Sequence, residues 1–263
     1  MSSSASRALR ILEAVGAAER PLGATEVGRA LGISPATAFR GLDALERAGY
    51  VARFQASTKF VLGKAVAALR QNLLGRFPVR DVCMPYLRQL AFASGETASL
   101  TVRLGWYGLR IAAAPGTNEV TTALPLGAAR PLADGCACMA ILAGLDPGAV
   151  DAFAAWARRR KLRAPDPKSL AGVLADIRSR GFAVEATAFA RGRAALAFPL
   201  RAGPAVAAIA IEGPLLDLAR PAAHPDLPHW RGIVRSVEGV AQARPALFAG
   251  PFDHLDPDDI VLS

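Results

Sequence analysis

Apolar residues recur every three or four positions in the first third of the chain, a pattern that predicts short amphipathic helices. The first run covers residues 7–18 and is closed by Pro21. The second covers residues 26–31, with Thr25 as its expected N-cap and Gly32 as the residue that ends it. The chain is therefore expected to begin with two short helices joined by tight connections.

A third helix is expected to start at Ser34 and Pro35 and to run to about Ala48. The serine hydroxyl can accept an unpaired backbone N–H, and a proline at the first helical position loses no hydrogen bond. Thr37 and Arg40 fall outside the apolar face, so their side chains are available to a partner. A short helix, a glycine turn and a capped helix indicate a helix-turn-helix, and a generic three-helix bundle is the weaker alternative.

The segment after this helix has the pattern of a β-hairpin. Residues 50–54 and 59–62 are expected to form its strands, and residues 55–58 its turn. Arg53 and Lys59 flank the tip of the hairpin, where a basic side chain can reach a DNA phosphate or the minor groove. The hairpin therefore adds a wing to the helix-turn-helix.

Beyond residue 63 the pattern predicts further helices, followed by a mixture of strands and helices. Helices are expected at residues 64–74, 79–94, 135–144, 147–160, 166–180 and 228–243. Strands are expected at residues 96–104, 106–114, 120–124, 182–189, 193–201 and 205–212. Six strands in this order describe an α+β domain with one antiparallel sheet and helices packed on it.

Four segments follow from these patterns. They are a winged helix-turn-helix at residues 1–63, a linker helix at 64–78, the α+β domain at 79–245 and a loose, acidic C-terminal tail at 246–263. No apolar run reaches the roughly 18–20 residues that a membrane span requires, and the N-terminus lacks the pattern of a secretory signal. The protein is therefore expected to be cytoplasmic, with no membrane partner.

The distribution of charge favours a polyanionic partner. The formal net charge is +9, and residues 1–76 hold eleven basic and five acidic side chains. Most of the positive excess therefore lies beside the helix-turn-helix pattern, as DNA binding requires, because Lys and Arg neutralise phosphates. Double-stranded DNA is the expected partner.

An enzyme is the main alternative, and the sequence argues against it. The chain has neither a Gly-x-Ser-x-Gly motif nor a phosphate-binding Gly-Lys-Ser/Thr loop. Cys136 lies close to Asp134 but has no general base at hand. The three cysteines and three histidines are not spaced as metal ligands, so no catalytic residue, metal or cofactor is expected. A ligand-binding or scaffold protein whose DNA-binding domain has lost its function is a third alternative.

The chain resembles the IclR family of bacterial transcriptional regulators up to about Ala243. Seven short segments, in the family's order and at its intervals, carry the resemblance. They are SRALRIL at 6–12, LGISPATAFR at 31–40, LERAGYV at 45–51, FVLG at 60–63, SGETA at 94–98, RGFAV at 180–184 and IEGP at 211–214. The resemblance implies a GAF-like effector-binding domain at residues 79–245. It also implies homodimers or homotetramers on near-palindromic operator DNA, with binding modulated by a small-molecule effector.

The residue pattern and the resemblance together indicate which residues contact DNA. They are Ser34, Pro35, Ala36, Thr37, Phe39, Arg40, Arg53 and Lys59. Arg40, with Thr37 beside it, is expected to contact a base edge or a phosphate. Ala36 and Phe39 stand where the family usually has Ser and commonly has His, and these changes favour an apolar contact to a thymine methyl group.

The expected effector site departs further from the family pattern. Its residues are Trp106, Asp134, Cys136, Ala137, Glu185, Ala195, Ala210 and Glu212. Ala133 and Met139 replace the family's His and Lys. Relatives that bind small carboxylates tend to have Gly, Cys and two Ser where this chain has Cys136, Ala195, Ala210 and Glu212.

This loss of polar groups bears on the ligand, because a pocket orients its ligand through a few polar side chains. The effector is expected to be more apolar or aromatic than a small oxoacid, with Trp106 and Tyr107 as possible walls. Glu212 would repel a carboxylate unless Arg193 neutralises it. The alternative is a pocket that an Arg193–Glu212 pair closes.

Overall fold

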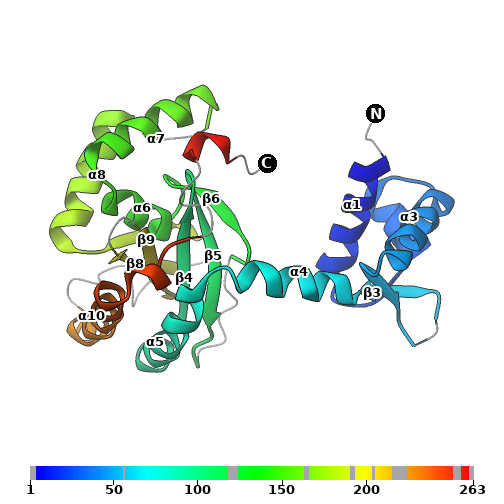
Figure 1. The fold of residues 1–263 in the computed structure, drawn as a ribbon, viewed down its shortest axis with the longest axis horizontal. Coiled ribbons are helices and arrows are strands. Elements are labelled where there is room, and N and C mark those ends of the chain that lie inside the picture. The colour runs from blue at the N-terminus through cyan, green and yellow to red at the C-terminus, as the bar shows by residue number, and fades with distance from the viewer. Residues whose placement is uncertain are drawn as a thin grey trace. The chain divides into compact units, whose positions relative to one another are not determined.

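The structure is a computed structural model that describes residues 4–55, 57–117, 124–162, 166–189, 193–202, 205–214, 224–250 and 256–260. The chain divides into two compact units, Met1–Gly75 and Arg76–Ser263. Figure 1 shows the first unit in blue to cyan and the second in cyan to red. Each unit has a hydrophobic core of its own, as expected of separate domains.

Three helices form most of the first unit: α1 (Ser4–Ala17), α2 (Ala24–Leu31) and α3 (Pro35–Arg47). The buried side chains of its core are Ile11, Val15, Val27, Ala38, Leu42, Leu45, Val51 and Phe60. In α3 the buried residues Ala38, Leu42 and Leu45 are three or four positions apart, so one face of this helix is buried. Helix α4 (Lys64–Leu74), the predicted linker, has no buried residue.

A tight turn joins α2 to α3. Gly32 ends α2 with φ +66°, a conformation that glycine adopts at little cost. The Ile33 N–H then donates to the Gly28 carbonyl at 3.0 Å. A Cβ on Gly28 would lie 2.8 Å from the Ile33 carbonyl oxygen, which is too close for an ordinary contact. The helix-turn-helix therefore depends on both glycines.

The start of α2 differs from the prediction. The sequence indicates Thr25 as the N-cap, but the helix begins at Ala24 and Gly23 takes the cap position. The Gly23 N–H donates to the Glu26 carboxylate at 2.8 Å, and Arg20 pairs with the same carboxylate at 2.6 Å. The Glu26 carboxylate, in the first turn of α2, therefore caps this helix, because it accepts a hydrogen bond from the backbone N–H at the cap position. The Thr25 hydroxyl does not serve this donor.

The wing is a three-stranded antiparallel sheet in the order β1-β3-β2. Strands β2 (Val51–Arg53) and β3 (Lys59–Leu62) form the predicted hairpin, with Arg53 opposite Phe60. Strand β1 (Leu22–Gly23) pairs with β3. The sequence does not predict β1, because two residues are too few to show an alternating pattern.

The second unit is built on a six-stranded antiparallel sheet in the order β6-β5-β4-β9-β8-β7. Its strands are β4 (Thr97–Leu104), β5 (Tyr107–Ala114), β6 (Ala129–Pro131), β7 (Ala183–Phe189), β8 (Arg193–Ala202) and β9 (Ala205–Pro214). Strand β4 pairs with β9, with Thr97 opposite Glu212. The sheet therefore brings together side chains from two distant parts of the sequence.

One strand of this sheet is not where the sequence predicts it. The prediction is residues 120–124, but residues 118–123 lie outside the described part of the chain, and Leu124 is in a bend. Strand β6 pairs with β5 instead, with Tyr107 opposite Pro131. Three residues that include an arginine and a proline give no strand pattern, so the sequence does not reveal β6.

Helices cover both faces of the sheet (Figure 1). Helices α5 (Pro78–Ser94) and α10 (Leu227–Ala243) pack together on one face. Helix α6 (Cys136–Gly144) packs on the other face, mainly against β8 and β9, with α7 (Pro147–Arg159) and α8 (Pro167–Arg180) on that side. The antiparallel sheet flanked by helices confirms the predicted α+β class. None of the described helices is both long enough and apolar enough to cross a lipid bilayer.

Part of the acidic C-terminal segment packs on the second unit, which corrects the prediction of a loose tail. A 3₁₀ helix spans Pro257–Asp259. The Trp106 indole N–H donates to the Asp258 carboxylate at 2.6 Å, and Arg159 pairs with the same carboxylate. Residues 256–260 are thus attached to the β4–β5 turn and to α7.

Candidate functional site

The start of α3 carries three polar side chains that are exposed or half-buried. Ser34 accepts the Thr37 N–H at 3.2 Å, and the two hydroxyl oxygens lie 2.8 Å apart. Arg40, one turn further on, donates from Nη2 to the Thr37 hydroxyl at 3.2 Å. The three side chains form a continuous chain of hydrogen bonds outside the buried face of the helix.

The other α3 residues of the predicted DNA surface are exposed as well. Pro35 and Ala36 lie in the first turn. Phe39 exposes 46% of its surface although it is apolar. The first turns of α3 therefore offer both an arginine and an apolar side chain to a partner.

The two basic residues of the wing differ in their contacts. Arg53 forms an ion pair with Glu46 of α3 at 3.2 Å, and its guanidinium lies over the Phe60 ring, 5.0 Å from the ring centroid. Lys59 is exposed on the other strand of the hairpin. Contacts within the unit thus hold Arg53, whereas Lys59 extends into solvent.

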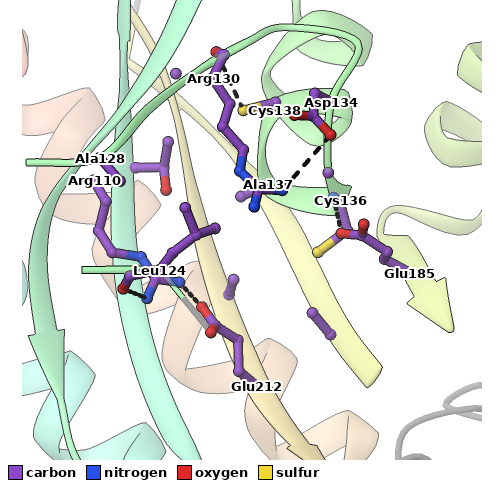
Figure 2. A pocket seen from close by; sticks show the side chains of 15 residues that line it. Arg110, Leu124, Ala128, Arg130, Asp134, Cys136, Ala137, Cys138, Glu185 and Glu212 are labelled. Atoms are coloured by element: carbon purple, nitrogen blue, oxygen red, sulfur yellow. Dashed lines mark hydrogen bonds and ion pairs between the residues drawn. The ribbon is translucent and has the colours of Figure 1, made fainter. Parts of the chain in front are cut away.

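The second unit contains a cavity between the sheet and the start of α6 (Figure 2). Its lining residues are Thr101, Gly108, Arg110, Leu124, Ala128, Arg130, Asp134, Gly135, Cys136, Ala137, Cys138, Glu185, Ala195, Ala210 and Glu212. The cavity volume is about 40 Å³, counted as the space open to the centres of water molecules. The space that the water molecules themselves can fill is larger than this, because a water extends about 1.4 Å beyond its centre.

A buried ion pair forms one wall of the cavity. Arg110 of β5 and Glu212 of β9 are 4% and 5% exposed, and their charged groups are in direct contact (Figure 2). Arg110 also donates to Ser99 Oγ at 3.1 Å and to the Leu124 carbonyl at 2.8 Å, and Ser99 donates to Glu212 at 3.2 Å. Burial lowers the pKa of Arg110 to about 10, so the guanidinium stays protonated at neutral pH.

A side chain from a distant strand caps the start of α6. Gly135 precedes the helix with φ +89°, and the Cys136 N–H donates to Glu185 Oε2 at 2.9 Å. The partial positive charge of a helix N-terminus favours a carboxylate at this position. Arg130 and Asp134 face each other nearby at 3.6 Å. Among the described residues, the cavity lining therefore holds three carboxylates and two guanidinium groups.

The two cysteines of the cavity are poor nucleophiles. Burial raises the pKa of the Cys136 thiol far above its ordinary range, and the Glu185 carboxylate adds to the shift. Burial likewise raises the pKa of Cys138 to about 12. Both residues are therefore protonated thiols at neutral pH. In the described part of the chain, no three His, Cys, Asp or Glu side chains are grouped so that they could hold a metal ion.

Two protein-family models match this chain. The model of the IclR helix-turn-helix domain matches residues 4–53, and the model of the bacterial transcriptional regulator IclR C-terminal domain matches residues 71–224. The chain belongs to the IclR family. IclR proteins are transcriptional regulators and not enzymes, so the helix-turn-helix is a DNA-binding domain and the second unit is an effector domain.

Individual IclR-family proteins agree with this assignment. The glycerol operon regulatory protein of Streptomyces coelicolor is 28% identical over 219 residues, which cover 81% of this chain and 85% of that protein. Thermotoga maritima IclR gives a TM-score of 0.73 at 21% identity, over 92% of this chain and 98% of that chain. An IclR homologue from Microbacterium hydrocarbonoxydans, solved with 4-hydroxybenzoate, gives a TM-score of 0.68 at 20% identity, over 92% and 100%. These two structures share the fold described above.

Most residues that the IclR resemblance indicates for the effector lie around the cavity at the start of α6. They are Asp134, Cys136, Ala137, Glu185, Ala195, Ala210 and Glu212. Trp106 is not among them, because it packs against Phe153 and Trp156, with ring centroids 5.9 and 6.4 Å away. Tyr107 packs edge-on against Trp156, 5.4 Å between centroids. The two aromatic residues expected as walls thus belong to the hydrophobic core of the IclR effector domain and not to the cavity.

The cation beside Glu212 is Arg110 and not the expected Arg193. The expected partner, Arg193, lies in β8, and its side chain is outside the described residues. The sequence does hold a signal for Arg110, because it interrupts the otherwise apolar run of β5 and a charge buried in a sheet needs a partner. Thr101 and Arg130 also line the cavity and carry no comparable signal.

Proposed function

We propose that this IclR-family regulator binds near-palindromic, double-stranded operator DNA as a homodimer or homotetramer. Helix α3 enters the major groove, and the wing contacts the adjacent backbone or minor groove. A small-molecule effector in the cavity of the second unit changes the affinity for DNA. The effector can shift the balance between two conformations of the regulator, which differ in their affinity for DNA, only by as much as its own affinities for these conformations differ.

The observation that carries this proposal is the hydrogen-bonded chain of Ser34, Thr37 and Arg40 on an accessible helix face. The bond to Thr37 restrains Arg40 before DNA arrives, so the arginine loses less side-chain freedom on binding. A guanidinium group suits a bidentate contact to guanine, and a threonine can contact a base edge beside it. Phe39 adds an apolar surface that fits a thymine methyl group.

Exposed apolar side chains in the first unit support self-association. Leu9 of α1 is 60% exposed, and Leu69 and Leu73 of α4 are 54% and 42% exposed. Apolar surface of this kind is commonly covered in an oligomer. A symmetric dimer would place two copies of α3 about 34–36 Å apart, or a multiple of that, on a near-palindromic operator.

The effector part of the proposal is supported by the cavity and by a fold relative. The Microbacterium hydrocarbonoxydans homologue binds 4-hydroxybenzoate, which indicates that this fold can hold a small molecule. In the present chain the cavity combines buried charges with small apolar side chains such as Ala195 and Ala210. A few polar groups on a mostly apolar lining are typical of ligand sites.

The test is a footprint and gel-shift titration of the full chain on its own upstream DNA at several salt concentrations. Affinity should fall steeply with salt, because Lys and Arg release counterions from phosphates. Arg40→Ala should weaken binding by about 1–3 kcal/mol and relax the sequence preference at one position. The matched control is Arg158→Ala, the same change at an exposed position of α7. Absence of salt-sensitive binding at physiological ionic strength would contradict the proposal.

A further inference from the structure

We infer that Phe54, at the tip of the wing, inserts as an apolar wedge into the minor groove of the operator and bends the DNA there. The inference rests on the proposed function, since it adds a DNA-bending residue to the proposed DNA-binding surface. It follows from the accessibility of Phe54, from the face of the hairpin on which this residue lies, from its cationic neighbour and from the hydrogen bonds that hold the tip.

Phe54 is an aromatic residue that the first unit leaves accessible. It comes directly after β2 and exposes 40% of its surface, whereas Phe60 of the neighbouring strand is buried in the core. A single exposed apolar side chain is common on protein surfaces. Exposure alone therefore does not indicate a partner, and the surroundings of Phe54 decide the matter.

The strand pairing places Phe54 on the face of the hairpin that is turned away from the core. Arg53 is opposite Phe60 and lies over its ring, so these two residues share the inner face. The Phe54 N–H donates to the Lys59 carbonyl at 2.9 Å, which makes Phe54 and Lys59 the next pair along the hairpin. Because successive side chains of a strand alternate between its faces, this pair belongs to the outer face.

The outer face carries positive charge next to Phe54. Lys59 is exposed. The Gly23 N–H and Arg20 lower the pKa of Glu26 most, and Lys59 adds to that shift. Among these described residues two cations thus share one carboxylate, and positive charge remains. The minor groove is narrow and has a negative potential, so an apolar tip with a cation beside it suits this groove.

Hydrogen bonds hold the backbone of the tip. The Phe54 carbonyl accepts the Ser57 N–H at 2.9 Å and the Ser57 hydroxyl at 2.6 Å. Ser57 Oγ also accepts the Lys59 N–H at 3.2 Å. Gln55, which follows Phe54, has φ +47°, the left-handed conformation that tight turns use. A wedge whose backbone is held before DNA arrives loses less conformational freedom on insertion.

An inserted side chain changes the shape of DNA in a defined way. An apolar wedge between two base pairs separates their stacked bases and kinks the duplex by about 20–90°. The separation costs least at the flexible pyrimidine–purine steps TA and CA/TG. The wing therefore favours operators with such a step beneath its tip, a preference that depends on the deformability of DNA and not on hydrogen bonds to base edges.

A circular-permutation gel shift of the full chain, on the operator fragment that the footprint identifies, measures the bend. The parent should bend the operator by at least about 20°, and Phe54→Ala should remove most of the bend, because alanine is too short to separate base pairs. Phe54→Leu keeps an apolar wedge and should keep most of the bend. A straight operator in the parent complex, or an equal bend with Phe54→Ala, would overturn the inference.

Permanganate, which oxidises unstacked thymines, locates the kink. Each TA and CA/TG step contains a thymine, so the kinked step should react in the parent complex and in that of Phe54→Leu. The same thymine should be protected in the complex of Phe54→Ala. A parent complex without any reactive thymine would overturn the inference, and this measurement needs no variant to fold.

Two further variants separate the wedge from the charge beside it. Lys59→Ala should reduce the slope of affinity against salt by about one phosphate contact and keep the bend, whereas Phe54→Ala removes no charge and should keep the slope. Phe92→Ala is the same change at a position of α5 that is 84% exposed, and it should alter neither quantity. If Lys59→Ala loses the bend as fully as Phe54→Ala, neutralised charge and not a wedge bends the DNA, and the inference is overturned.

Sedimentation without DNA separates a wedge from a contact between copies of the chain. Phe54→Ala should keep the oligomeric state of the parent. A smaller species would overturn the inference, because Phe54 would then act through self-association.

The same preparations separate this inference from the proposed function. If salt-sensitive operator binding is intact but the bound DNA is straight, only the wedge is wrong. If salt-sensitive operator binding is absent, the proposed function itself fails.

Discussion

On α3, the side chains of Ser34, Thr37 and Arg40 contact one another within two helical turns and remain accessible to solvent. In the cavity of the second unit, Arg110 and Glu212 come from strands on either side of β4 and are almost completely buried. Breaking the exposed cluster removes the proposed surface for DNA and leaves the core intact. Breaking the buried pair leaves an unpaired charge in the interior, so its first cost is to stability.

The largest expected effect is on the buried pair. Arg110→Ala or Glu212→Ala should each destabilise the second unit by about 3–5 kcal/mol, because the remaining charge is left buried without its partner. Tryptophan fluorescence during urea unfolding measures this selectively, since all three tryptophans, Trp106, Trp156 and Trp230, lie in the second unit.

The control for that experiment is the double variant Arg110→Met with Glu212→Leu. Apolar side chains of similar volume remove both charges together, so most of the lost stability should return. If the double variant unfolds as easily as the single variants, packing and not the unpaired charge accounts for the loss.

The next largest effect is expected at the turn of the helix-turn-helix. Gly28→Ala places a methyl group 2.8 Å from a backbone oxygen, so the first unit should lose about 1–3 kcal/mol. Circular dichroism during heating measures it. The control is Gly172→Ala in α8, where no atom lies within 4 Å of the added carbon, and alanine should stabilise the helix by up to about 1 kcal/mol. Equal melting of Gly28→Ala and the parent would contradict the need for glycine.

A smaller effect is expected at the cap of α3. Ser34→Ala removes the acceptor of the Thr37 N–H and should cost about 1 kcal/mol of first-unit stability. Ser34→Asp keeps an acceptor and should keep most of the stability. The tryptophan fluorescence of the second unit should not change in either variant. A change there would mean that the loss of the α3 cap affects more than the first unit.

The smallest expected effect is a pH dependence at α2. The Gly23 N–H and Arg20 lower the pKa of Glu26 below its usual 4.5. A group whose pKa is lowered by folding adds stability above the unfolded pKa and loses it as the pH falls through the folded pKa. Glu26→Gln should therefore be less stable than the parent well above pH 4.5, and the two should converge well below it. If the difference in stability between Glu26→Gln and the parent were the same well above and well below pH 4.5, this prediction would be contradicted.

The difference between the two clusters also explains how far the sequence predicts this molecule. The start of α3 follows from Gly32, Ser34 and Pro35, which act on neighbouring residues. Through the family pattern the sequence also indicates seven of the fifteen residues that line the cavity. It does not reveal β6, because this three-residue edge strand is defined by its pairing with β5 and has no alternating pattern of its own. It does not reveal the Arg110–Glu212 contact either, because strand order, and not local pattern, makes those residues neighbours.

The contact between Trp106 and Asp258 has a consequence for synthesis on the ribosome. The two residues are 152 positions apart. At about 5–20 residues per second, roughly 8–30 seconds separate their appearance on a nascent chain. The helix-turn-helix, whose contacts lie within the first 75 residues, can fold before that interval begins. Each new polypeptide can therefore fold its DNA-binding domain before the contact between Trp106 and Asp258 forms, and Asp258 appears half a minute or less after Trp106.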